Sequence, residues 1–519
     1  QFFAQYKANY RSLANSQKKS FAERTLANPE LKLKYERTKE RHDLTNKYLA
    51  LKYPYSQGVG DNNLFRFFLE KSLSLLAPGG LLSYILPNAL LTEDSSLKLR
   101  KLILEKYTLL SVDGFENRQG LFPDVHRGYK FSLIQIENQL APQQSPLVRF
   151  KLTDPLALKT PTDRFPYSLD DLKATSPQRL AFMETAGGAK DLKILKNLYS
   201  KYPPFNPLWL EFRRELHSFH DKEIFLETEK PGVLPLYKGE MIWQFAAQVA
   251  RPKYWLEPSQ FDQYLLGPRL ARLKSDLKAQ FQNDATLQKE FKNGLEWPKI
   301  LAFLGLKNDD QLKPLIIPER NFPRLAFRAI AGDTDERTLI SALVPKNIGA
   351  QNSLWLSIAG TYHLSLEGQK IIFQPTPILK LLFVQALFNS LIVDWLLRAM
   401  VAINVSKTYV RRLPLPQPSD QELETNPELA HLIRDSLILS LSQSPELRRD
   451  LQGFLSVQPT DLLKTPQELA IRQAALDGQV ARLYGLTGPE MGAILESFKV
   501  LKTKKPFYYE LIQENIKNL

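Results

Sequence analysis

The stretch DNNLFRFFLEKSLSLLAPGGLLSYILPN, residues 61–88, decides the fold. Apolar residues recur at helical spacing over 64–76, and the Pro-Gly-Gly run at 78–80 ends the helix and turns the chain. The apolar run that follows, 81–88, is typical of a short buried strand. Asp61 precedes the periodic residues and is the expected helix N-cap, because its side chain accepts a hydrogen bond from the first turn.

The pattern continues beyond this stretch in the same alternating order. A helix is predicted over 95–105, a strand over 108–117 and, after a loop, a strand over 129–138. This order is typical of one half of a doubly wound α/β domain. Such a sheet binds ligands at the carboxyl ends of its strands, which here carry Pro87, Asn88, Glu116 and Asn117.

The rest of the chain divides by composition. Residues 140–170 are rich in proline and threonine and predict a boundary, and RRLPLPQPSD at 411–420 cannot continue a helix. We therefore expect three domains: a partial Rossmann-like α/β sheet over 1–150, a mixed α+β domain over 151–418, and a small helical tail over 419–519. The lysine-rich residues 1–55 predict a solvated helical segment.

Charge and composition restrict the function. The 519 residues include 69 Lys and Arg against 55 Asp and Glu, a net charge of +14, which favours a polyanionic partner without choosing among DNA, RNA and acidic lipid. The absence of cysteine excludes disulfides, thiolate zinc sites and a cysteine nucleophile, and suits a reducing cytoplasmic location. The longest charge-free apolar run, 381–393, is shorter than the roughly 20 residues that a bilayer requires, so no membrane partner is expected.

The exact string at 61–88 resembles the segment that follows the catalytic loop in gamma-class N6-adenine DNA methyltransferases. There a helix of the type NLYxxFLExAxxLLKPGG leads into a strand ending in Pro-Asn. The counterparts here are Asn63, Leu64, Phe65, Phe68, Leu69, Glu70, Pro78, Gly79, Gly80 and Pro87. The resemblance implies S-adenosylmethionine as cofactor, with Phe68 packed against its adenine ring; the alternative is that Phe68 is a core residue.

The resemblance continues through GFENRQGLFPDVHRGYKFSLIQIE, residues 114–137. The family places a Phe in the loop before the next strand, where it stacks on the target adenine after that base has left the duplex. Here that residue is Phe122, for which a hydrophobic loop anchor is the alternative. Arg127 and Lys130 lie beside it as phosphate contacts or solvated charges, and His126 has no evident catalytic partner.

The downstream half resembles the target-recognition region of type IIG restriction–modification enzymes and related defence-island methyltransferases. The resemblance rests on five segments in order: WLEFRRELHSFHDKEIF (209–225), LPLYKGEMIWQF (234–245), RLAFRAIAGDTDERTLISALVPKN (324–347), ALFNSLIVDWLLR (386–398) and VSKTYVRRLPLPQP (405–418). It implies that 151–418 reads the DNA site and that 1–150 is the C-terminal half of a methyltransferase domain.

Six residues of this region are candidate DNA contacts. Arginine offers a planar fork to guanine edges or phosphates, although a solvated loop is the alternative for the two arginines that flank the turn at Gly332. The basic cluster near 410 suits a DNA-backbone contact, whose strength falls steeply with salt. The candidates are Arg328, Arg337, Lys407, Tyr409, Arg411 and Arg412.

Two motifs that the resemblance requires are not found: the glycine-rich turn after the first strand and N-P-P-Y/F/W. YPPFNP at 202–207 lacks Asn or Asp before its prolines. In the family both motifs lie just upstream of a sequence like QFFAQYKANY, so we expect Gln1 to lie just past the catalytic loop of a longer protein. Methyl transfer needs no metal, and we find no nuclease or metal motif; a nuclease fused upstream would need magnesium.

These observations lead to one hypothesis and two alternatives. The hypothesis is a site-specific, S-adenosylmethionine-dependent DNA adenine-N6 methyltransferase of a restriction–modification or phage-defence system, whose partners are double-stranded DNA and other subunits of that system. One alternative is a DNA-specificity subunit without catalytic activity of its own. The other is methylation of RNA or protein.

Overall fold

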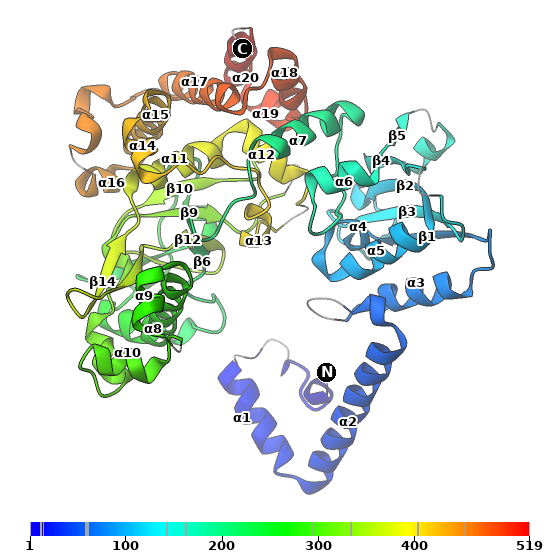
Figure 1. The fold of residues 1–519 in the computed structure, drawn as a ribbon, viewed down its shortest axis with the longest axis horizontal. Coiled ribbons are helices and arrows are strands. Elements are labelled where there is room, and N and C mark those ends of the chain that lie inside the picture. The colour runs from blue at the N-terminus through cyan, green and yellow to red at the C-terminus, as the bar shows by residue number, and fades with distance from the viewer. Residues whose placement is uncertain are drawn as a thin grey trace. The chain divides into compact units, whose positions relative to one another are not determined.

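A computed structural model describes the chain except for residues 1, 11, 12, 14, 58–61, 142–143, 161–162, 293, 333–334, 402–403, 452 and 518. The chain forms two units (Figure 1), and each is described by itself. The first unit contains Gln1–Tyr202 and Arg398–Ala402, and the second contains Pro203–Leu397 and Ile403–Leu519.

The first unit begins with the helices α1 (Asn15–Leu26) and α2 (Pro29–Lys52). Asn28 caps α2, because its side chain accepts hydrogen bonds from the backbone N–H groups of Glu30 and Leu31. No residue of α2 is buried, which confirms the prediction of a solvated helical segment.

The predicted order of elements in 61–138 is confirmed. Asn63 caps α3 through the backbone N–H of Phe65, whereas Asp61, the predicted cap, lies outside the described residues. A short helix, α4, that was not predicted separates β1 from α5. The elements are α3 (Leu64–Leu75), β1 (Leu81–Pro87), α4 (Ala89–Thr92), α5 (Leu97–Lys106), β2 (Thr108–Glu116) and β3 (Lys130–Glu137).

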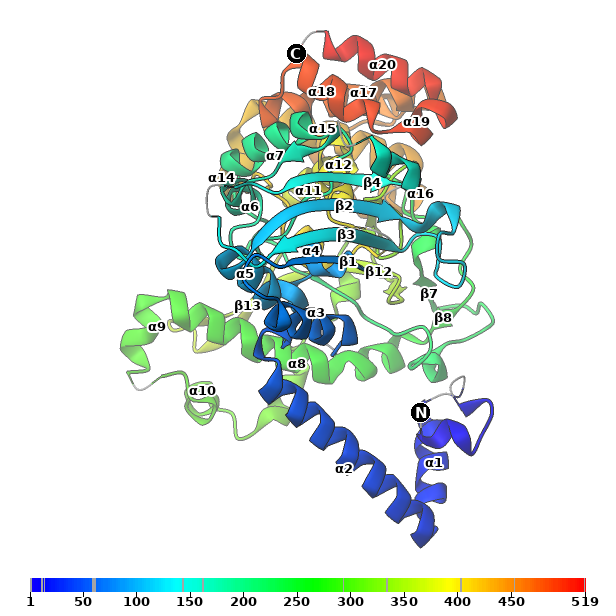
Figure 2. The ribbon, with the colours of Figure 1, turned by 90° about the vertical axis from the view of Figure 1, so that its right-hand side faces the viewer.

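These strands belong to a five-stranded sheet in the order β1-β3-β2-β4-β5. Figure 2 shows β1, β3, β2 and β4 side by side in this order. A loop rather than a crossover helix joins β2 to β3, so β3 runs antiparallel to both of its neighbours. β4 (Leu147–Leu152) pairs in parallel with β2, and β5 (Phe165–Pro166) pairs with β4. The boundary predicted within 140–170 is therefore wrong, because strand pairing carries the first unit on through α6 (Leu169–Thr175) and α7 (Ala189–Lys201).

Helices α3 and α5 cover one face of this sheet. Leu69 and Leu73 of α3 and Leu99 of α5 are buried in one core with Val112 and Ile134 of the sheet. In the described part of the chain, β1 pairs only with β3 and forms an outer edge of the sheet. Its residues Leu81 and Ile85 are 68% and 58% exposed.

The second unit is built on a four-stranded sheet in the order β10-β9-β12-β6. Helix α11 packs on β9 and β10, and α15 and α17 pack on α11 (Figure 1). The bounds are β6 (Phe212–Arg213), β9 (Arg324–Arg328), β10 (Ser341–Val344), β12 (Leu354–Ser357), α11 (Ile378–Asn389), α12 (Leu391–Arg398) and α13 (Lys407–Val410).

The predicted helical tail is also confirmed. It consists of α14 (Asp420–Thr425), α15 (Pro427–Gln443), α16 (Pro445–Asp450), α17 (Pro466–Tyr484), α18 (Gly488–Glu496), α19 (Lys499–Lys504) and α20 (Pro506–Ile516). It is not a separate domain, since α15 and α17 share the core of the second unit with α11.

Two smaller layers complete this unit. One is a three-stranded sheet of β7 (Leu234–Tyr237), β8 (Trp255–Leu256) and β11 (Gly349–Ala350). The other packs a hairpin of β13 (Gly360–Ser365) and β14 (Lys370–Pro375) against α8 (Pro258–Asn283), α9 (Ala285–Glu290) and α10 (Trp297–Phe303). Among the described residues, no single helix has the length and apolarity of a membrane span; only α11 and α12 taken together do, and they bend by 63°.

Candidate functional site

The ends of three strands meet at one edge of the sheet in the first unit. Pro87, at the end of β1, lies opposite Phe131 near the start of β3, and Glu116, at the end of β2, lies opposite Lys130. The strand-end residues singled out from the sequence therefore do lie at one edge. Because the loop between β2 and β3 leaves from this edge, its side chains are held beside the strand ends.

Asn117 holds that loop closed. Its side chain is buried; its amide Nδ2 donates to the carbonyl oxygens of Phe122 and Val125, each at 2.9 Å, and its Oδ1 accepts from the backbone N–H of Phe122 at 2.9 Å. Gly120 has a φ of +72°, and a Cβ there would overlap the guanidinium of Arg127. One asparagine side chain thus fixes the position of Phe122.

Phe122 is supported on one side and open on another. Its ring meets Phe131 edge-on, with centroids 5.0 Å apart, and Phe131 stacks on Phe115 at 5.4 Å. Phe122 itself remains 40% exposed. A supported aromatic ring with exposed surface is suited to stacking on a flat ligand, whereas a hydrophobic anchor would be buried.

A polar network lies at the same strand ends. The amide of Asn88 donates to Glu184, and the hydroxyl of Ser132 donates to Asn88. Lys130 Nζ lies 2.6 Å from the other carboxylate oxygen of Glu184, which is 54 residues further along the chain. The side chain of Lys130 is only 9% exposed, and its charge is paired with Glu184 inside the protein, so Lys130 is not available for a DNA contact. Arg127 is exposed.

Glu116 offers an unused acceptor at this edge. The residue is buried, and Arg118 donates to its Oε2. Its other oxygen, Oε1, is buried and accepts no hydrogen bond from the described residues. A buried carboxylate oxygen without a donor costs free energy and is often explained by a role in binding or catalysis. The sequence placed Glu116 at the strand end, but nothing in its surrounding residues indicated this orphaned oxygen.

Phe68 is a surface residue rather than a core residue. It is 62% exposed on α3 and shares its face with Leu64 and Leu75, which are 65% and 73% exposed, while Leu69 and Leu73 point into the core. An exposed aromatic ring fits one wall of a site for the adenine ring of S-adenosylmethionine. The described residues supply this wall alone, since the glycine-rich turn is not present in the chain.

The second unit separates the remaining predicted DNA contacts into two groups. Arg337 lies in the interior: its side chain is 0% exposed, its Nε is 3.3 Å from Asp394, and it donates to the carbonyl of Asn389. A side chain enclosed in this way does not reach DNA, so Arg337 is not one of the DNA contacts. Arg328 donates Nε to the carbonyl of Ile242 at 3.0 Å and lies over the ring of Trp243, and its burial lowers its pKa.

The predicted basic cluster is brought together around Glu211. Lys407 Nζ lies 3.3 Å from one carboxylate oxygen of Glu211, and Arg411 donates to the other. The guanidinium of Arg412 lies 4.9 Å from the ring centroid of Tyr409. Lys407 and Arg411 remain about one third exposed, with side-chain exposures of 32% and 37%. Both therefore still face solvent while bonded to Glu211.

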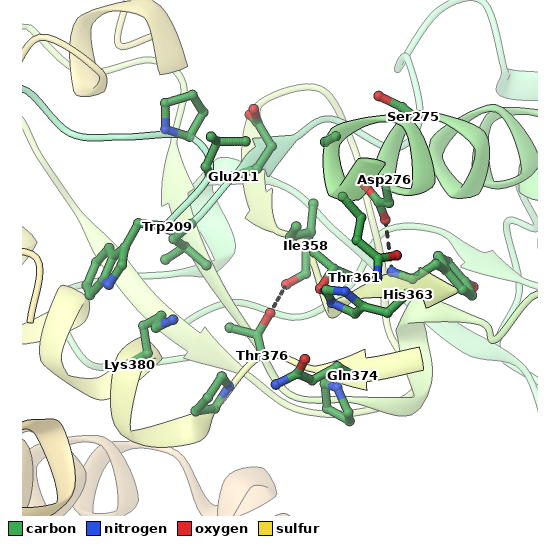
Figure 3. A pocket seen from close by; sticks show the side chains of 18 of the residues that line it. Trp209, Glu211, Ser275, Asp276, Ile358, Thr361, His363, Gln374, Thr376 and Lys380 are labelled. Atoms are coloured by element: carbon green, nitrogen blue, oxygen red, sulfur yellow. Dashed lines mark hydrogen bonds between the residues drawn. The ribbon is translucent and has the colours of Figure 1, made fainter. Parts of the chain in front are cut away.

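A cavity of about 610 Å³ is lined in part by Glu211 (Figure 3). Its walls come from residues 207–211, α8, the β13–β14 hairpin and the start of α11. Its charged groups are largely bonded to the protein: Asp276 accepts from the backbone N–H of Tyr362 at 3.1 Å, and Lys380 Nζ lies 2.9 Å from Asp420. Burial raises the pKa of Asp276. In the part of the chain that the structure describes, no cluster of three His, Cys, Asp or Glu residues could hold a metal.

A family model matches part of the first unit. The model of the Eco57I restriction-modification methylase family matches residues 34–122, a segment that contains α3, β1 and β2 and ends at Phe122. This segment is therefore similar to restriction–modification methylases. The methylase segment thus includes Phe68, Asn117 and Phe122, and its match supports a DNA methyltransferase role. No curated protein matches the chain.

Three solved restriction–modification enzymes are similar to the chain at low identity. They are the type IIL enzyme MmeI in complex with DNA (11% identity, 85% of this chain and 52% of that one, TM-score 0.44), the type IIG endonuclease BpuSI (11%, 89% and 50%, 0.29) and the ATP-dependent type ISP enzyme LlaBIII bound to DNA (11%, 78% and 28%, 0.30). The chain spans about half or less of the length of each.

Proposed function

We propose that the chain is part of a site-specific DNA methyltransferase that transfers a methyl group from S-adenosylmethionine to N6 of adenine in a restriction–modification or phage-defence system. The match of residues 34–122 to the restriction–modification methylase family carries this proposal. The exposed ring of Phe122 at the carboxyl ends of the strands supports it, because a base extruded from the duplex needs an aromatic surface on which to stack.

Four residues of the first unit have a stated role in this proposal. Phe122 stacks on the extruded adenine, and Phe131 supports the ring from the side. Asn117 holds the loop so that little ordering is needed when the base arrives. Phe68 would border the cofactor. When bound, the cofactor would supply a methyl group from its sulfonium to N6, so that the carbon–sulfur bond breaks, a neutral thioether leaves and the proton of N6 passes to solvent.

The missing motifs would be supplied at the outer edge of β1. Exposed edges of a sheet are normally paired or shielded. β1 has neither protection: its edge carries no further strand among the described residues, and Leu81 and Ile85 are exposed. A further strand paired with β1 would cover this edge, and it would bring N-P-P-Y/F/W and the glycine-rich turn to the side of Phe122.

DNA recognition falls to the second unit in this proposal. Its members share a cationic or aromatic side chain with some exposure, and they position the duplex rather than take part in the chemistry. With Arg127 of the first unit, they are Arg328, Lys407, Tyr409 and Arg411; Arg412 is buried beside Tyr409 and is not a member.

The test uses the complete enzyme and duplex DNA with 2-aminopurine at the target position. The fluorescence of 2-aminopurine rises when the base leaves the stack. Phe122→Ala is expected to reduce this rise, since the extruded base loses its stacking partner, worth roughly 1–3 kcal/mol. Leu121→Ala is the matched control, because Leu121 is an exposed apolar residue of the same loop. An undiminished signal with Phe122→Ala would remove Phe122 from the site.

A DNA-specificity subunit without catalysis is the second candidate, and it is favoured by the lack of both cofactor motifs in the 519 residues. Titration with S-adenosylmethionine separates the two. A methyltransferase containing this chain binds the cofactor and methylates the duplex, whereas a specificity subunit shows no response to the cofactor. Competition among duplex DNA, RNA and peptide substrates tests the remaining alternative.

A further inference from the structure

Arg214 lies over an aromatic ring at an edge of the second unit's sheet. Its guanidinium carbon is 4.3 Å from the centroid of Trp355. The neighbouring pair Arg213 and Leu356 shows the register of β6 and β12, which brings residue 214 beside residue 355. Trp355 is itself fixed, because its Nε1 donates to the carbonyl of Val405 at 3.2 Å. The guanidinium therefore rests on a ring whose position is fixed by a hydrogen bond.

The guanidinium of Arg214 has no acid to neutralise it. Among the described residues, no carboxylate lies within ion-pair distance and none of its N–H groups makes a hydrogen bond. Partial burial lowers the pKa of Arg214, with no carboxylate to oppose the effect. The adjacent arginine-acid contacts show the difference: Glu215 bonds to Arg324, and Glu211 bonds to Arg411. Both nearby acids are thus already taken by other cations.

A second cation lies at the same ring. Lys407 Nζ is 5.8 Å from the centroid of Trp355. Both distances are measured to the centroid of the Trp355 ring, so the two cationic groups are at most about 10 Å apart. The phosphates of one DNA strand follow each other every 3.4 Å or so along the helix axis, so both cations can reach the same stretch of backbone.

We propose that Arg214, held on Trp355, binds a phosphate of the DNA backbone together with Lys407. The proposal rests on the function proposed above and adds to it two residues, Arg214 and Trp355, that the sequence did not indicate. Aromatic stacking leaves the donor edge of a guanidinium free, and it limits the conformations that binding would otherwise have to freeze. Arg214 has no acid to neutralise it, and Lys407 keeps about a third of its side chain exposed while it is paired with Glu211, so a polyanion can reach both charges. Backbone contacts of this kind do not depend on base sequence.

The experiment measures binding of the full chain to labelled duplexes of several sequences by fluorescence anisotropy, over a series of salt concentrations. Arg214→Leu removes the charge and keeps an apolar side chain over Trp355. It is expected to weaken binding by about tenfold for every sequence, as for the loss of one charged hydrogen bond. The slope of log K against log salt should fall by about 0.9, the value for one phosphate contact.

Two further variants control for charge and stacking. Arg449→Leu removes an exposed arginine of α16, elsewhere in the same unit, and should leave the affinity and the slope near those of the wild type. Trp355→Leu keeps the charge of Arg214 but removes its support. Its slope should stay near the wild-type value while the affinity falls by a few fold. Thermal unfolding of each variant shows that the fold is kept.

The outcomes separate this inference from the function on which it rests. Wild-type affinity and slope in Arg214→Leu, with duplex binding otherwise intact, would overturn the inference alone. A loss confined to one base sequence would also overturn it, because it would make Arg214 a reader of bases. A wild-type chain that binds no duplex at all would overturn both the inference and the proposed DNA recognition.

Discussion

Replacing Asn117 with alanine tests whether one side chain holds the loop that carries Phe122. The change removes three hydrogen bonds of 2.9 Å, two to the carbonyl oxygens of Phe122 and Val125 and one from the N–H of Phe122. Each is worth about 1 kcal/mol net, so closure of the loop should weaken by about 3 kcal/mol. Since 1.4 kcal/mol is a factor of ten, the loop should open about a hundredfold more often.

Hydrogen exchange measured by mass spectrometry reads this out directly. In Asn117→Ala, the amides of residues 118–129 are expected to exchange about a hundredfold faster, while those of β2 and β3 change little. Asn117→Asp keeps the acceptor for Phe122 but turns both donated bonds into contacts between oxygens, so it should open the loop at least as far. In the complete enzyme, both variants should also lower the 2-aminopurine signal.

The matched control is Asn138→Ala at the opposite end of β3. Asn138 is also an asparagine that donates to a backbone carbonyl, that of Leu76 at 2.7 Å, but its amide makes one such bond and does not touch the loop. Its substitution should leave the exchange of 118–129 unchanged. Unchanged exchange of this loop in Asn117→Ala would refute the reasoning, because it would show that the hydrogen bonds of Asn117 do not hold the loop closed.

Three further predictions concern the side chains of Phe68, Asp171 and Glu211. Phe68→Ala in the complete enzyme should weaken S-adenosylmethionine binding in a titration, yet change the unfolding free energy by less than about 0.5 kcal/mol, because the ring is already exposed. Burial would raise the pKa of Asp171, but hydrogen bonds from Lys196 and Ser168 outweigh it and lower that pKa. Ionised Asp171 therefore stabilises the fold above its unfolded pKa near 3.8, and this stability is lost as the pH falls from about 4 through the lower pKa of the folded state. The unfolding free energy of Asp171→Asn should consequently fall less steeply with decreasing pH than that of the wild type. Glu211→Gln frees Lys407 and Arg411 from their shared acid and should tighten duplex binding at low salt by about two- to threefold, an effect that anisotropy would show to vanish at high salt.

The elements of the first unit could be predicted because their signals are local. Helical spacing in α3, the Pro-Gly-Gly turn and the apolar run of β1 all lie within 28 consecutive positions, 61–88. Which strands become neighbours is not a local property. β3 takes its place between β1 and β2, and β4 joins the sheet from within the segment predicted as a boundary, because of pairings over long stretches of chain.

The candidate site divides in the same way. Phe122 could be placed in a loop at the strand ends from sequence alone, and its exposure there fits the role expected for it. The partner of Lys130 could not be predicted, because Glu184 lies 54 residues further on and outside every motif. The enclosure of Arg337 likewise depends on Asp394, which arrives on a different helix. A basic residue in a motif indicates a charge, but only the fold shows whether that charge is already neutralised.

Whether a charge is neutralised explains why Arg214 differs from the arginines that the motifs singled out. Each of these arginines has an acceptor within the protein: Arg337 lies beside the buried carboxylate of Asp394, Arg411 bonds to Glu211, and Arg328 donates to the carbonyl of Ile242. Arg214 stacks on Trp355 and bonds to no acid of the described chain. Arg214 is exposed, so water solvates its N–H groups while no ligand is bound. A DNA phosphate would displace this water and supply the opposite charge that Arg214 lacks within the protein, and the release of counterions from the DNA favours that exchange.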